Sequence, residues 1–337
     1  MSDPIVSILS PTYNHEKYIH QCILSAQNQT FQNWEMLILD DGSLDNTYVI
    51  AKSYADKDPR IKVLTQANKG IFKLGETYNR GLSQARGKYI AILEGDDMWS
   101  PTKLERQVIQ LENDPSIVIA WGQNALMNED LSTTYSIQPN TDKIASSLLN
   151  NTPPGSIIEI LPQNAWLPAL TLLIRKENLL RIGGFIQSHG MPLVDFPTLL
   201  TISTHGPFYY DNFVMGVWRI YSTQTTKKYT TEMWLGMKQF ISEWLPKIHS
   251  IDSAKRRDIL KCFDQICLTA YARSGRYKLI RREFESARKD YLKALFYPIG
   301  GKLVWRLRAL IGYTFSFLKL DVEWLAKLLG KKTYSNK

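Results

Sequence analysis

The sequence predicts an α/β fold in which a mostly parallel sheet is flanked by helices and followed by an α-helical C-terminal region. Two observations support this prediction. Over the first 125 residues, short apolar runs alternate with amphipathic segments of helical length, which is the pattern of consecutive βαβ units. From about residue 230, apolar residues recur at helical spacing to the end of the chain.

The expected elements of the first 125 residues can be assigned in order. Each expected strand is a short, nearly continuous apolar run, as a strand buried on both faces requires. These runs occupy residues 5–10, 35–39, 60–64, 89–93 and 117–121. The segments between them have amphipathic spacing; Asp45 can cap one helix, and Pro101 stands where another begins. The expected helices are 18–29, 45–54, 74–85 and 102–112.

The chain between residues 126 and 225 is less regular. Residues 126–165 are polar and rich in turn formers, including Pro153, Pro154 and Gly155, so we expect an irregular connection there. A strand is expected at 170–174, and a helix stop at Gly183 and Gly184. Two further apolar runs, 207–210 and 213–220, continue the strand pattern.

The composition is that of an ordinary globular protein. Of 337 residues, 44% are hydrophobic and 22% are charged, which excludes a disordered chain and a collagen-like repeat. No run approaches the roughly 18 apolar residues of a transmembrane helix, and the N-terminus lacks the basic region of a secretory signal. Three scattered cysteines suit a reducing compartment and not a zinc site or a disulfide framework. We therefore expect a soluble, cytoplasmic protein.

Charge is distributed unevenly along the chain. Residues 1–225 contain 17 Lys and Arg against 22 Asp and Glu, a net charge of −5, whereas residues 226–337 contain 24 against 10, a net charge of +14. A basic module of this kind can bind nucleic acid, an anionic membrane surface or a polyanionic substrate, or it can present a solvated helical face. The chain therefore divides into residues 1–225 and 226–337.

Polar side chains gather where three of the expected strands end. In chain order they are Pro11, Thr12 and Tyr13, then Asp40 and Asp41, then Glu94, Gly95, Asp96 and Asp97. Ligands bind beyond the carboxyl ends of parallel strands, and the five carboxylates gathered there would repel one another. A divalent cation relieves this repulsion, and oxygen ligands favour Mg²⁺ or Mn²⁺ over zinc. A metal that clamps a diphosphate fits this arrangement; ordinary turns are the alternative.

Other common active-site motifs are absent from the sequence. There is no GxGxxG after a strand and no GxxxxGKS/T, so dinucleotide and P-loop sites are unsupported. HExxH and GxSxG are also missing. The acidic strand ends are therefore the best candidate site.

The same strand ends carry a resemblance to a known family. The stretch VSILSPTYNHEKYIHQCILSAQNQTFQNWEMLILDDGS, then NKG at 68–70, YNRGLSQARGKYIAILEGDDMW at 78–99 and GGF at 183–185 resemble, in this order, the family 2 glycosyltransferases. The similarity is strong over residues 4–125 and looser to about residue 222. It implies a GT-A type, Rossmann-like fold, with a nucleotide-sugar-binding part (1–125), an acceptor side (126–225) and an inverting transfer reaction.

The resemblance implies donor-binding roles for individual positions. Pro11, Thr12 and Tyr13 would line the nucleotide base, Asp40 and Asp41 would contact uracil or ribose, and Asn68 and Arg80 would contact base or sugar-phosphate. Glu94, Gly95 and Asp96 occupy the place of the family's DxD motif, with Glu instead of the first Asp. Asp96 is then the expected ligand of Mn²⁺ or Mg²⁺, with Asp97 beside it.

Two later residues are expected to take part in the chemistry. An inverting transfer needs a general base near the acceptor hydroxyl. Asp195, followed as in the family by an aromatic residue and a proline, is the candidate, and capping of the next helix is its alternative role. Arg219 resembles the arginine of the family's Arg-x-His pattern, although Tyr221 replaces the histidine. It would pair with the leaving diphosphate, and a structural salt bridge is the alternative.

Residues 302–332 combine leucine and aromatic residues with Arg and Lys. A basic amphipathic helix of this kind can lie in the interface of an anionic leaflet. Packing against the catalytic domain or a partner helix is the alternative.

The favoured interpretation is a metal-dependent inverting glycosyltransferase. It would move a hexosyl or N-acetylhexosaminyl group from a nucleotide-diphospho-sugar, with UDP preferred, to a glycan or glycolipid acceptor in surface polysaccharide or glycolipid synthesis. We expect a cytoplasmic protein, peripheral at the inner face of the membrane, that binds no nucleic acid. The alternatives are a nucleotidyltransferase, disfavoured by the missing glycine-rich phosphate loop, and a non-enzymatic nucleotide- or polyanion-binding protein.

Overall fold

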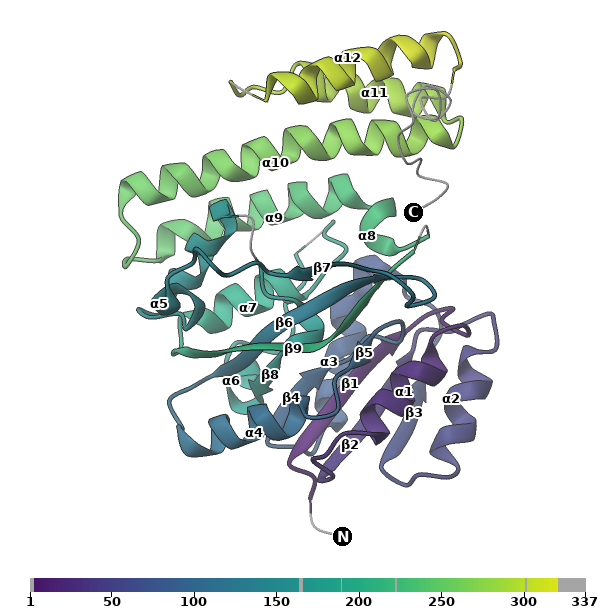
Figure 1. Cartoon of the computed structure of the whole chain (residues 1–337), viewed down its shortest axis with the longest axis vertical. Coiled ribbons are helices and arrows are strands. Elements are labelled where there is room, and N and C mark those ends of the chain that lie inside the picture. The colour runs from purple at the N-terminus through teal and green to yellow at the C-terminus, as the bar shows by residue number, and fades with distance from the viewer. Residues whose placement is uncertain (1–2, 164–165, 189, 222, 301, 321–337) are drawn as a thin grey trace. The chain divides into compact units, whose positions relative to one another are not determined.

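A computed structural model describes residues 3–163, 166–188, 190–221, 223–300 and 302–320 (Figure 1). The chain separates into two compact units. The first consists of Met1–Arg219 with Ile248–Ile251, and the second of Ile220–Lys247 with Asp252–Lys337. Each unit has a hydrophobic core of its own.

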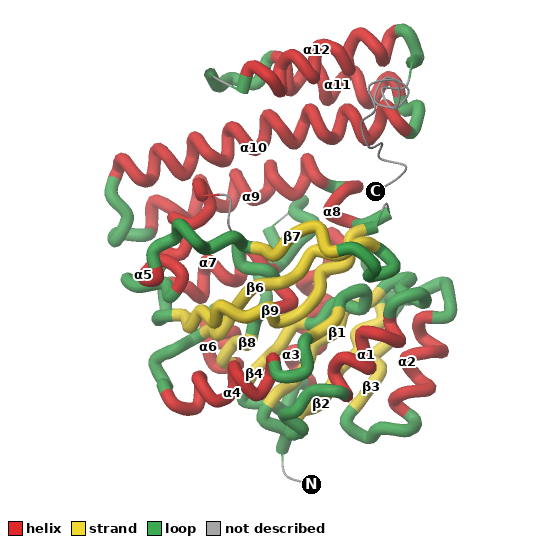
Figure 2. Tube along the Cα trace, viewed as in Figure 1, coloured by secondary structure: helices red, strands yellow, loops and turns green. Residues whose placement is uncertain are grey.

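The first unit is built on a nine-stranded sheet with the order β3-β2-β1-β4-β8-β6-β9-β5, and β7 pairs with β6 (Figure 2). The strands are β1 (Val6–Thr12), β2 (Trp34–Asp40), β3 (Ile61–Thr65), β4 (Tyr89–Ile92), β5 (Met98–Trp99), β6 (Ile119–Asn128), β7 (Thr134–Gln138), β8 (Leu173–Arg175) and β9 (Phe208–Ile220). The helices are α1 (Ile19–Gln27), α2 (Thr47–Ala55), η1 (Ile71–Lys73), α3 (Leu74–Gln84), α4 (Lys103–Asn113), α5 (Ser146–Leu149), η2 (Ser156–Gln163), η3 (Ala169–Thr171), α6 (Lys176–Arg181) and α7 (Asp195–Ser203). The predicted α/β class is confirmed.

The sheet is parallel in its first half and antiparallel in its second. β1 pairs in parallel with β2 and β4, and β2 pairs in parallel with β3, because a helix crosses over between these strands. β8 runs antiparallel to β4 and β6, and β5 runs antiparallel to β9. β1, β2, β3 and β4, the strands of the βαβ pattern, therefore pair with one another in parallel, and the sheet as a whole is mixed.

Helices cover both faces of the parallel strands, which explains their continuous apolar runs. On one face, α1, α2 and α4 pack on alternate strand residues such as Ile8 and Met36. On the opposite face, α3 approaches β1 and β2 closely at Gly81. A Cβ there would stand 2.8 Å from Leu39 Cδ1 and 3.2 Å from Leu9 Cδ2.

Two expectations for residues 126–220 are corrected by the structure. The segment 126–165 is not irregular throughout, because β6 continues to Asn128 and forms a hairpin with β7. Residues of β7 such as Tyr135 and Ile137 are exposed, so this strand lacks the buried apolar run that marks the others. The two apolar runs after residue 206 form one strand, β9. Its internal Asp211 is tolerated because Arg106 pairs with it at 2.8 Å.

The second unit is helical, as expected. Its helices are α8 (Thr225–Lys228), α9 (Thr230–Trp244), η4 (Leu245–Lys247), α10 (Ser253–Ile280), α11 (Phe284–Leu295) and α12 (Leu303–Phe317). Tyr291 of α11 is buried between Gly275 of α10 and Gly312 of α12, where a Cβ at either glycine would collide with its ring. Within the described residues, no helix combines the length and the apolar character needed to cross a bilayer.

Candidate functional site

The carboxyl ends of the parallel strands form one edge of the sheet. Thr12 at the end of β1 pairs with Asp40 at the end of β2, and Asp40 pairs with Thr65 at the end of β3. Beyond β4, the Gly95 N–H donates to the Pro11 carbonyl at 3.1 Å. The structure thus brings the predicted residues Pro11, Thr12, Asp40 and Gly95 together at this edge.

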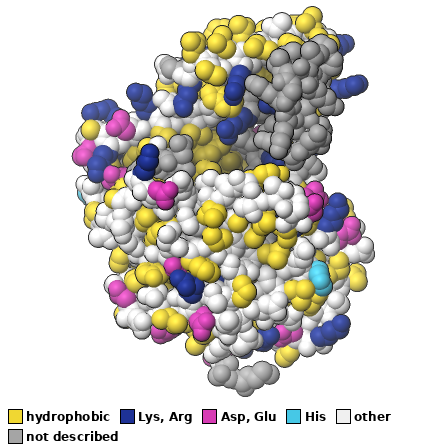
Figure 3. All heavy atoms as spheres, viewed as in Figure 1, with side chains coloured by type: hydrophobic (Ala, Val, Ile, Leu, Met, Phe, Trp, Pro, Cys, Tyr) yellow, Lys and Arg dark blue, Asp and Glu magenta, His cyan; other side chains and the backbone are white. Residues whose placement is uncertain are grey.

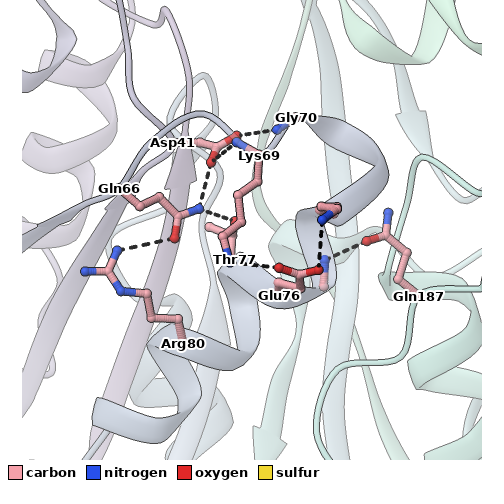
Figure 4. A network of polar contacts seen from close by, with 10 residues as sticks. Asp41, Gln66, Lys69, Gly70, Glu76, Thr77, Arg80 and Gln187 are labelled. Atoms are coloured by element: carbon pink, nitrogen blue, oxygen red, sulfur yellow. Dashed lines mark hydrogen bonds and ion pairs between the residues drawn. The ribbon is translucent and has the colours of Figure 1, made fainter.

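The Asp41 carboxylate organises the loop of residues 66–70 (Figure 4). Its Oδ1 accepts hydrogen bonds from Gln66 Nε2 at 2.7 Å and from the Lys69 N–H at 3.0 Å, and its Oδ2 accepts one from the Gly70 N–H at 2.9 Å. Asn68 Nδ2 donates to the Asp41 carbonyl at 2.8 Å. Asp41 and Asn68, both predicted to bind the donor, are thus joined in a loop that charge-assisted hydrogen bonds hold in shape.

The turn after β2 supports this loop. The Asp40 side chain is buried; its Oδ1 accepts from the Ser43 N–H at 3.2 Å and its Oδ2 from Thr65 Oγ1 at 3.0 Å. Gly42 has a φ of +73°, and a Cβ there would stand 2.8 Å from the backbone nitrogen of Asn68. Glycine is therefore required both by the backbone conformation and by the close approach of the loop.

Arg80 and Tyr13, both predicted to bind the donor, are each at least partly exposed. Arg80 Nη1 donates to the Thr65 carbonyl at 2.9 Å and to Gln66 Oε1 at 3.3 Å, so it braces α3 against the end of β3. Tyr13 is 40% exposed after the end of β1. The Tyr13 ring is therefore accessible, and Arg80 shapes the loop of residues 66–70; donor binding by both stays a prediction.

Glu94, Asp96 and Asp97 form an acidic cluster after β4. One carboxylate oxygen of each lies within 4.8 Å of the others. Burial and the charges of Asp96 and Asp195 raise the pKa of Glu94 to about 8. Burial and the charges of Asp96 and Glu94 likewise raise the pKa of Asp97 well above its usual value. The fold therefore holds the three side chains together against their mutual repulsion.

This acidic cluster fits a divalent cation. Carboxylates that repel one another are stabilised when a cation neutralises them, and oxygen ligands suit Mg²⁺ or Mn²⁺. The residues that would hold the ion are Glu94, Asp96 and Asp97. The sequence pattern places Glu94 in the donor site and leaves it out of the ligand set, whereas the fold brings its carboxylate beside the two aspartates.

Gly95 allows the acidic cluster to lie against β1. A Cβ at Gly95 would stand 2.5 Å from Thr12 Oγ1 and 2.8 Å from His15 Nδ1. Thr12 Oγ1 and His15 Nδ1 are themselves 3.1 Å apart. His15 belongs to no motif that predicts a site residue, and its place here depends on the turn that follows β1.

Asp195 is the first residue of α7 and lies near the acidic cluster. The N-cap residue of the helix is Val194, and no cap side chain bonds to the helix. Burial raises the pKa of Asp195. Besides burial, the charge of Asp195 contributes to the raised pKa of Glu94 and of Tyr78. The carboxylate predicted to act as a base is thus within electrostatic reach of the predicted metal ligands.

Helix α3 connects the loop at Asp41 with the acidic cluster. Thr77 Oγ1 accepts a hydrogen bond from Gln66 Nε2 at 2.7 Å, on the side of the loop. The next residue, Tyr78, is buried, and its hydroxyl donates to Glu94 Oε1 at 3.4 Å. Two adjacent residues of one helix therefore contact the two halves of the site.

Gln187 joins the start of α3 to the segment that leads to Asp195 (Figure 4). Its Oε1 accepts from the Gly75 N–H at 2.7 Å, and its Nε2 donates to the carbonyls of Ile71 at 2.8 Å and Met191 at 2.7 Å. Three backbone groups therefore meet at one amide side chain. Gln187 belongs to no recognisable sequence motif, so the sequence alone does not predict this position.

Arg219 lies buried beside the acidic cluster. Its Nε donates to the Asp96 carbonyl at 3.0 Å, and its backbone N–H donates to Asp97 Oδ1 at 3.2 Å. Its Nη2 donates to Gln21 Oε1 at 2.6 Å, and its Nη1 to the Glu129 carbonyl. Arg219 braces the backbone of the cluster, because pairing of β5 with β9 sets it next to Asp96. Its pairing with the leaving diphosphate stays a prediction.

Comparison with known proteins identifies the family. The model described as glycosyl transferase family 2 matches residues 7–166. The chain is 34% identical over 180 residues to the Escherichia coli protein named UDP-Glc:alpha-D-GlcNAc-diphosphoundecaprenol beta-1,3-glucosyltransferase WfgD, covering 53% of this chain and 68% of WfgD. This chain belongs to glycosyl transferase family 2. It spans only 41% and 42% of the length of two other curated relatives that it matches.

Solved structures share the fold of this family 2 chain. Residues 1–349 of S. aureus TarS, in complex with UDP-GlcNAc, match with a TM-score of 0.57 and 16% identity, over 97% of this chain and 92% of that one. The mannosyltransferase PcManGT from Pyrobaculum calidifontis, in complex with GDP-Man and Mn²⁺, matches with a TM-score of 0.58 and 15% identity, over 98% and 89%. This likeness establishes the GT-A fold that the sequence resemblance implied.

Proposed function

We propose that this family 2 chain transfers a hexosyl or N-acetylhexosaminyl group from a UDP-sugar to a hydroxyl of a glycan or glycolipid, with inversion at the anomeric carbon. The observation that carries the proposal is the acidic cluster of Glu94, Asp96 and Asp97, connected through α3 to the loop at Asp41. Support for the donor and acceptor comes from WfgD, whose name gives UDP-Glc and a diphosphoundecaprenol-linked sugar, and from TarS with UDP-GlcNAc.

The nucleotide binds along the ends of β1 and β2. Tyr13, exposed after β1, packs against the base together with Pro11 and Thr12. Asp41 and Asn68 present the loop of residues 66–70 to the base and ribose. Because the residues of this loop are already bonded to one another, the site needs little reordering when the donor binds.

The diphosphate binds at the acidic cluster. Glu94, Asp96 and Asp97 would hold Mn²⁺ or Mg²⁺, which supplies positive charge to the departing diphosphate. PcManGT, which shares the fold, is described with Mn²⁺. Arg219 keeps the backbone of Asp96 and Asp97 in place.

Asp195 acts as the general base. As the acceptor oxygen forms its bond to the anomeric carbon, the hydroxyl proton passes to the Asp195 carboxylate and the bond from that carbon to the diphosphate oxygen breaks. Attack on the face opposite the leaving group inverts the configuration. Burial raises the pKa of Asp195, and a raised pKa strengthens a carboxylate as a proton acceptor.

The acceptor side is formed by residues 126–225, and residues 226–337 are a basic helical region. The net charge of +14 in the latter suits attachment to the inner face of a membrane that carries a glycolipid acceptor. The protein then works in the cytoplasm, in the synthesis of surface polysaccharide or glycolipid.

A donor screen tests this function. The purified chain is incubated with UDP-, GDP- and TDP-sugars, with Mn²⁺ or with EDTA, and the released nucleoside diphosphate is measured. We expect metal-dependent release from a UDP-sugar that Asp96→Asn reduces by about 10²- to 10³-fold. Asp142→Asn makes the same change at an exposed position outside the cluster and is the control. Release that persists in EDTA, or that falls equally in both variants, contradicts the assigned site.

A further inference from the structure

Helix α12 carries apolar residues on both sides, with Trp305, Tyr313 and Phe315 packed against the core of the second unit and large apolar residues facing outward. Ala309, Gly312 and Ser316 are buried, and Gly312 lies against Tyr291 of α11. The outward residues are Leu303, Val304, Leu307, Leu310, Ile311 and Leu318, here named the α12 apolar face. Surface helices of globular proteins normally carry their apolar stripe on the inward side only and polar residues outward.

The α12 apolar face is well exposed, and Thr314 is the one polar residue within its arc. Its six residues are 48% to 69% exposed. At 3.6 residues per turn they fall within an arc of about 120°, and at 1.5 Å per residue the face extends over about 22 Å. Contiguous apolar surface of this kind marks a site of interaction, whereas single exposed leucines do not.

Positive charge borders the α12 apolar face. Lys302, Arg308 and Lys319 are exposed, and residues 302–320 include no Asp or Glu. Arg288 of α11 lies over the ring of the exposed Phe317, 4.6 Å from its centroid. Figure 3 shows apolar side chains gathered over α12 with Lys and Arg beside them. A second copy of the chain would bring like charges together at this face, whereas anionic lipid headgroups complement them.

The face is preformed because α12 is fixed to α11. The guanidinium of Arg306 donates to the carbonyls of Leu295, Tyr297 and Ile299, at and beyond the last turn of α11. Carbonyls at the end of a helix have no partner within it, so Arg306 supplies one. Binding to a surface therefore does not require α12 to fold first.

We propose that the α12 apolar face docks on an anionic lipid bilayer, with the helix axis in the plane of the membrane. The leucines enter the boundary between headgroups and acyl chains, and Arg308 and Lys319 lie at the phosphate level. Residues 321–332, the rest of the segment expected to be amphipathic, lie outside the described residues. This inference deepens the proposed function. The docking itself is argued from α12, and only its purpose, access to a glycolipid acceptor, rests on the proposed function.

Flotation of the full chain with lipid vesicles tests the docking. Vesicles of phosphatidylcholine mixed with phosphatidylglycerol are compared with vesicles of phosphatidylcholine alone. We expect binding to the mixed vesicles that the double variant Leu307→Glu and Ile311→Glu weakens by about a hundredfold. The control, Ile109→Glu with Leu180→Glu, makes the same kind of change at exposed residues of α4 and α6 and should bind like the parent chain. Arg308→Gln with Lys319→Gln should weaken binding by about fivefold for each charge removed.

Three outcomes would overturn the proposal. The first is equal binding to both kinds of vesicle, and the second is an equal loss in the two pairs of glutamate variants. The third is a dimer in light scattering that only the α12 variants dissociate, without vesicle binding, which would assign the face to a second copy. Circular dichroism of each variant shows whether it is folded.

The donor screen without vesicles separates this inference from the proposed function. A chain that cleaves a nucleotide-sugar in solution but does not float with anionic vesicles overturns the docking and leaves the function intact. A chain that floats but cleaves no donor supports the docking and contradicts the function.

Discussion

Asp41 and the acidic cluster lie at the same edge of the sheet but differ in what surrounds their charges. The Asp41 carboxylate accepts hydrogen bonds from Gln66, Lys69 and Gly70, all within 3.0 Å. Glu94, Asp96 and Asp97 instead lie against one another, and their proximity helps to raise the pKa of Glu94 and Asp97. One carboxylate is surrounded by donors from its own chain, whereas the other three crowd one another.

The difference separates a part of the candidate site whose charge is balanced by hydrogen bonds from a part whose charges lie against one another. Hydrogen bonds to a charged acceptor stabilise the folded chain, so the loop at Asp41 is ordered before any donor arrives. Crowded carboxylates destabilise the folded chain until protons or a cation neutralise them. Removing a charge should therefore have opposite effects on the stability of the two regions.

Among the variants that test this comparison, Glu94→Gln should give the largest effect. Glutamine keeps an oxygen that can accept from the Tyr78 hydroxyl but removes one negative charge. We expect turnover with Mn²⁺ to fall about a hundredfold. In EDTA at neutral pH, the free energy of unfolding should rise by about 1 kcal/mol, because the buried side chain at position 94 no longer has to take up a proton beside Asp96 when the chain folds.

Initial rates and urea unfolding in EDTA measure these two effects. Glu105→Gln makes the same change at an exposed residue of α4 and should leave both quantities close to those of the parent chain. A Glu94→Gln variant that is less stable than the parent in EDTA would contradict the repulsion.

Asp58 is a fully paired carboxylate outside the site, and it extends the comparison to a charge that has no part in binding. Arg60 donates to it through Nε at 3.0 Å and Nη2 at 2.8 Å, and Gln27 donates at 2.9 Å. Together these bonds outweigh burial and lower its pKa to about 2. Because this lies below the unfolded value of about 3.9, the stabilisation is present at neutral pH and is lost as the pH falls toward 2.

We expect Asp58→Asn to lower the free energy of unfolding by about 2 kcal/mol at neutral pH. The gap between variant and parent should narrow as the pH approaches the folded pKa. Urea unfolding at several pH values measures the gap, with Asp142→Asn as the control. A gap that stays constant with pH would show that the charge of Asp58 is not what stabilises the chain.

Asp41→Asn should weaken the loop of residues 66–70. The asparagine amide nitrogen cannot accept the N–H bonds that one carboxylate oxygen now receives. We expect the free energy of unfolding to fall by about 1 kcal/mol and the KM for the donor to rise about tenfold, with a small change in kcat. Steady-state kinetics and urea unfolding test this, and a lowered kcat with an unchanged KM would contradict it.

Gln187→Ala should have the smallest effect on activity, and it should lower kcat while leaving the donor KM almost unchanged. It removes the link between α3 and the segment before Asp195 without touching the loop at Asp41. We expect kcat to fall about fivefold and the donor KM to change less than about twofold, because the base is misplaced. Gln187→Glu keeps the acceptor for the Gly75 N–H, so its kcat should lie between those of the parent chain and of Gln187→Ala. A raised donor KM in Gln187→Ala would contradict the assignment.

Much of the parallel half of the fold could be predicted because its strands are buried on both faces. The apolar pattern predicts a first strand that ends before Pro11, but β1 continues to Thr12. The Pro11 carbonyl accepts the Gly95 N–H, so its nitrogen faces the same side, beyond the end of β4. A missing N–H costs little there, because no strand remains to be paired. Pro11 is therefore tolerated in β1 because β4 ends before it, and the apolar pattern of β1 alone does not show where β4 ends.

The site was predictable where it depends on strand ends and not where it depends on long-range packing. Asp40 ends a buried strand, and Asp41 and Asp96 follow buried strands, so local pattern alone predicts where these residues lie. The contacts of Arg219 instead depend on β9, which follows the acidic cluster by more than a hundred residues and meets it through β5. No local pattern carries that information.

The position of α3 has a thermodynamic consequence. Through Thr77 it is bonded to Gln66 of the loop at Asp41, and through Tyr78 to Glu94, so the ligands proposed for these two places would act on the same helix. When two ligands each reduce the motion of one element, the first lowers the entropic cost of binding the second. Such cooperativity would be reciprocal: the proposed nucleotide would increase the affinity for the proposed cation by the same factor by which the cation increases the affinity for nucleotide.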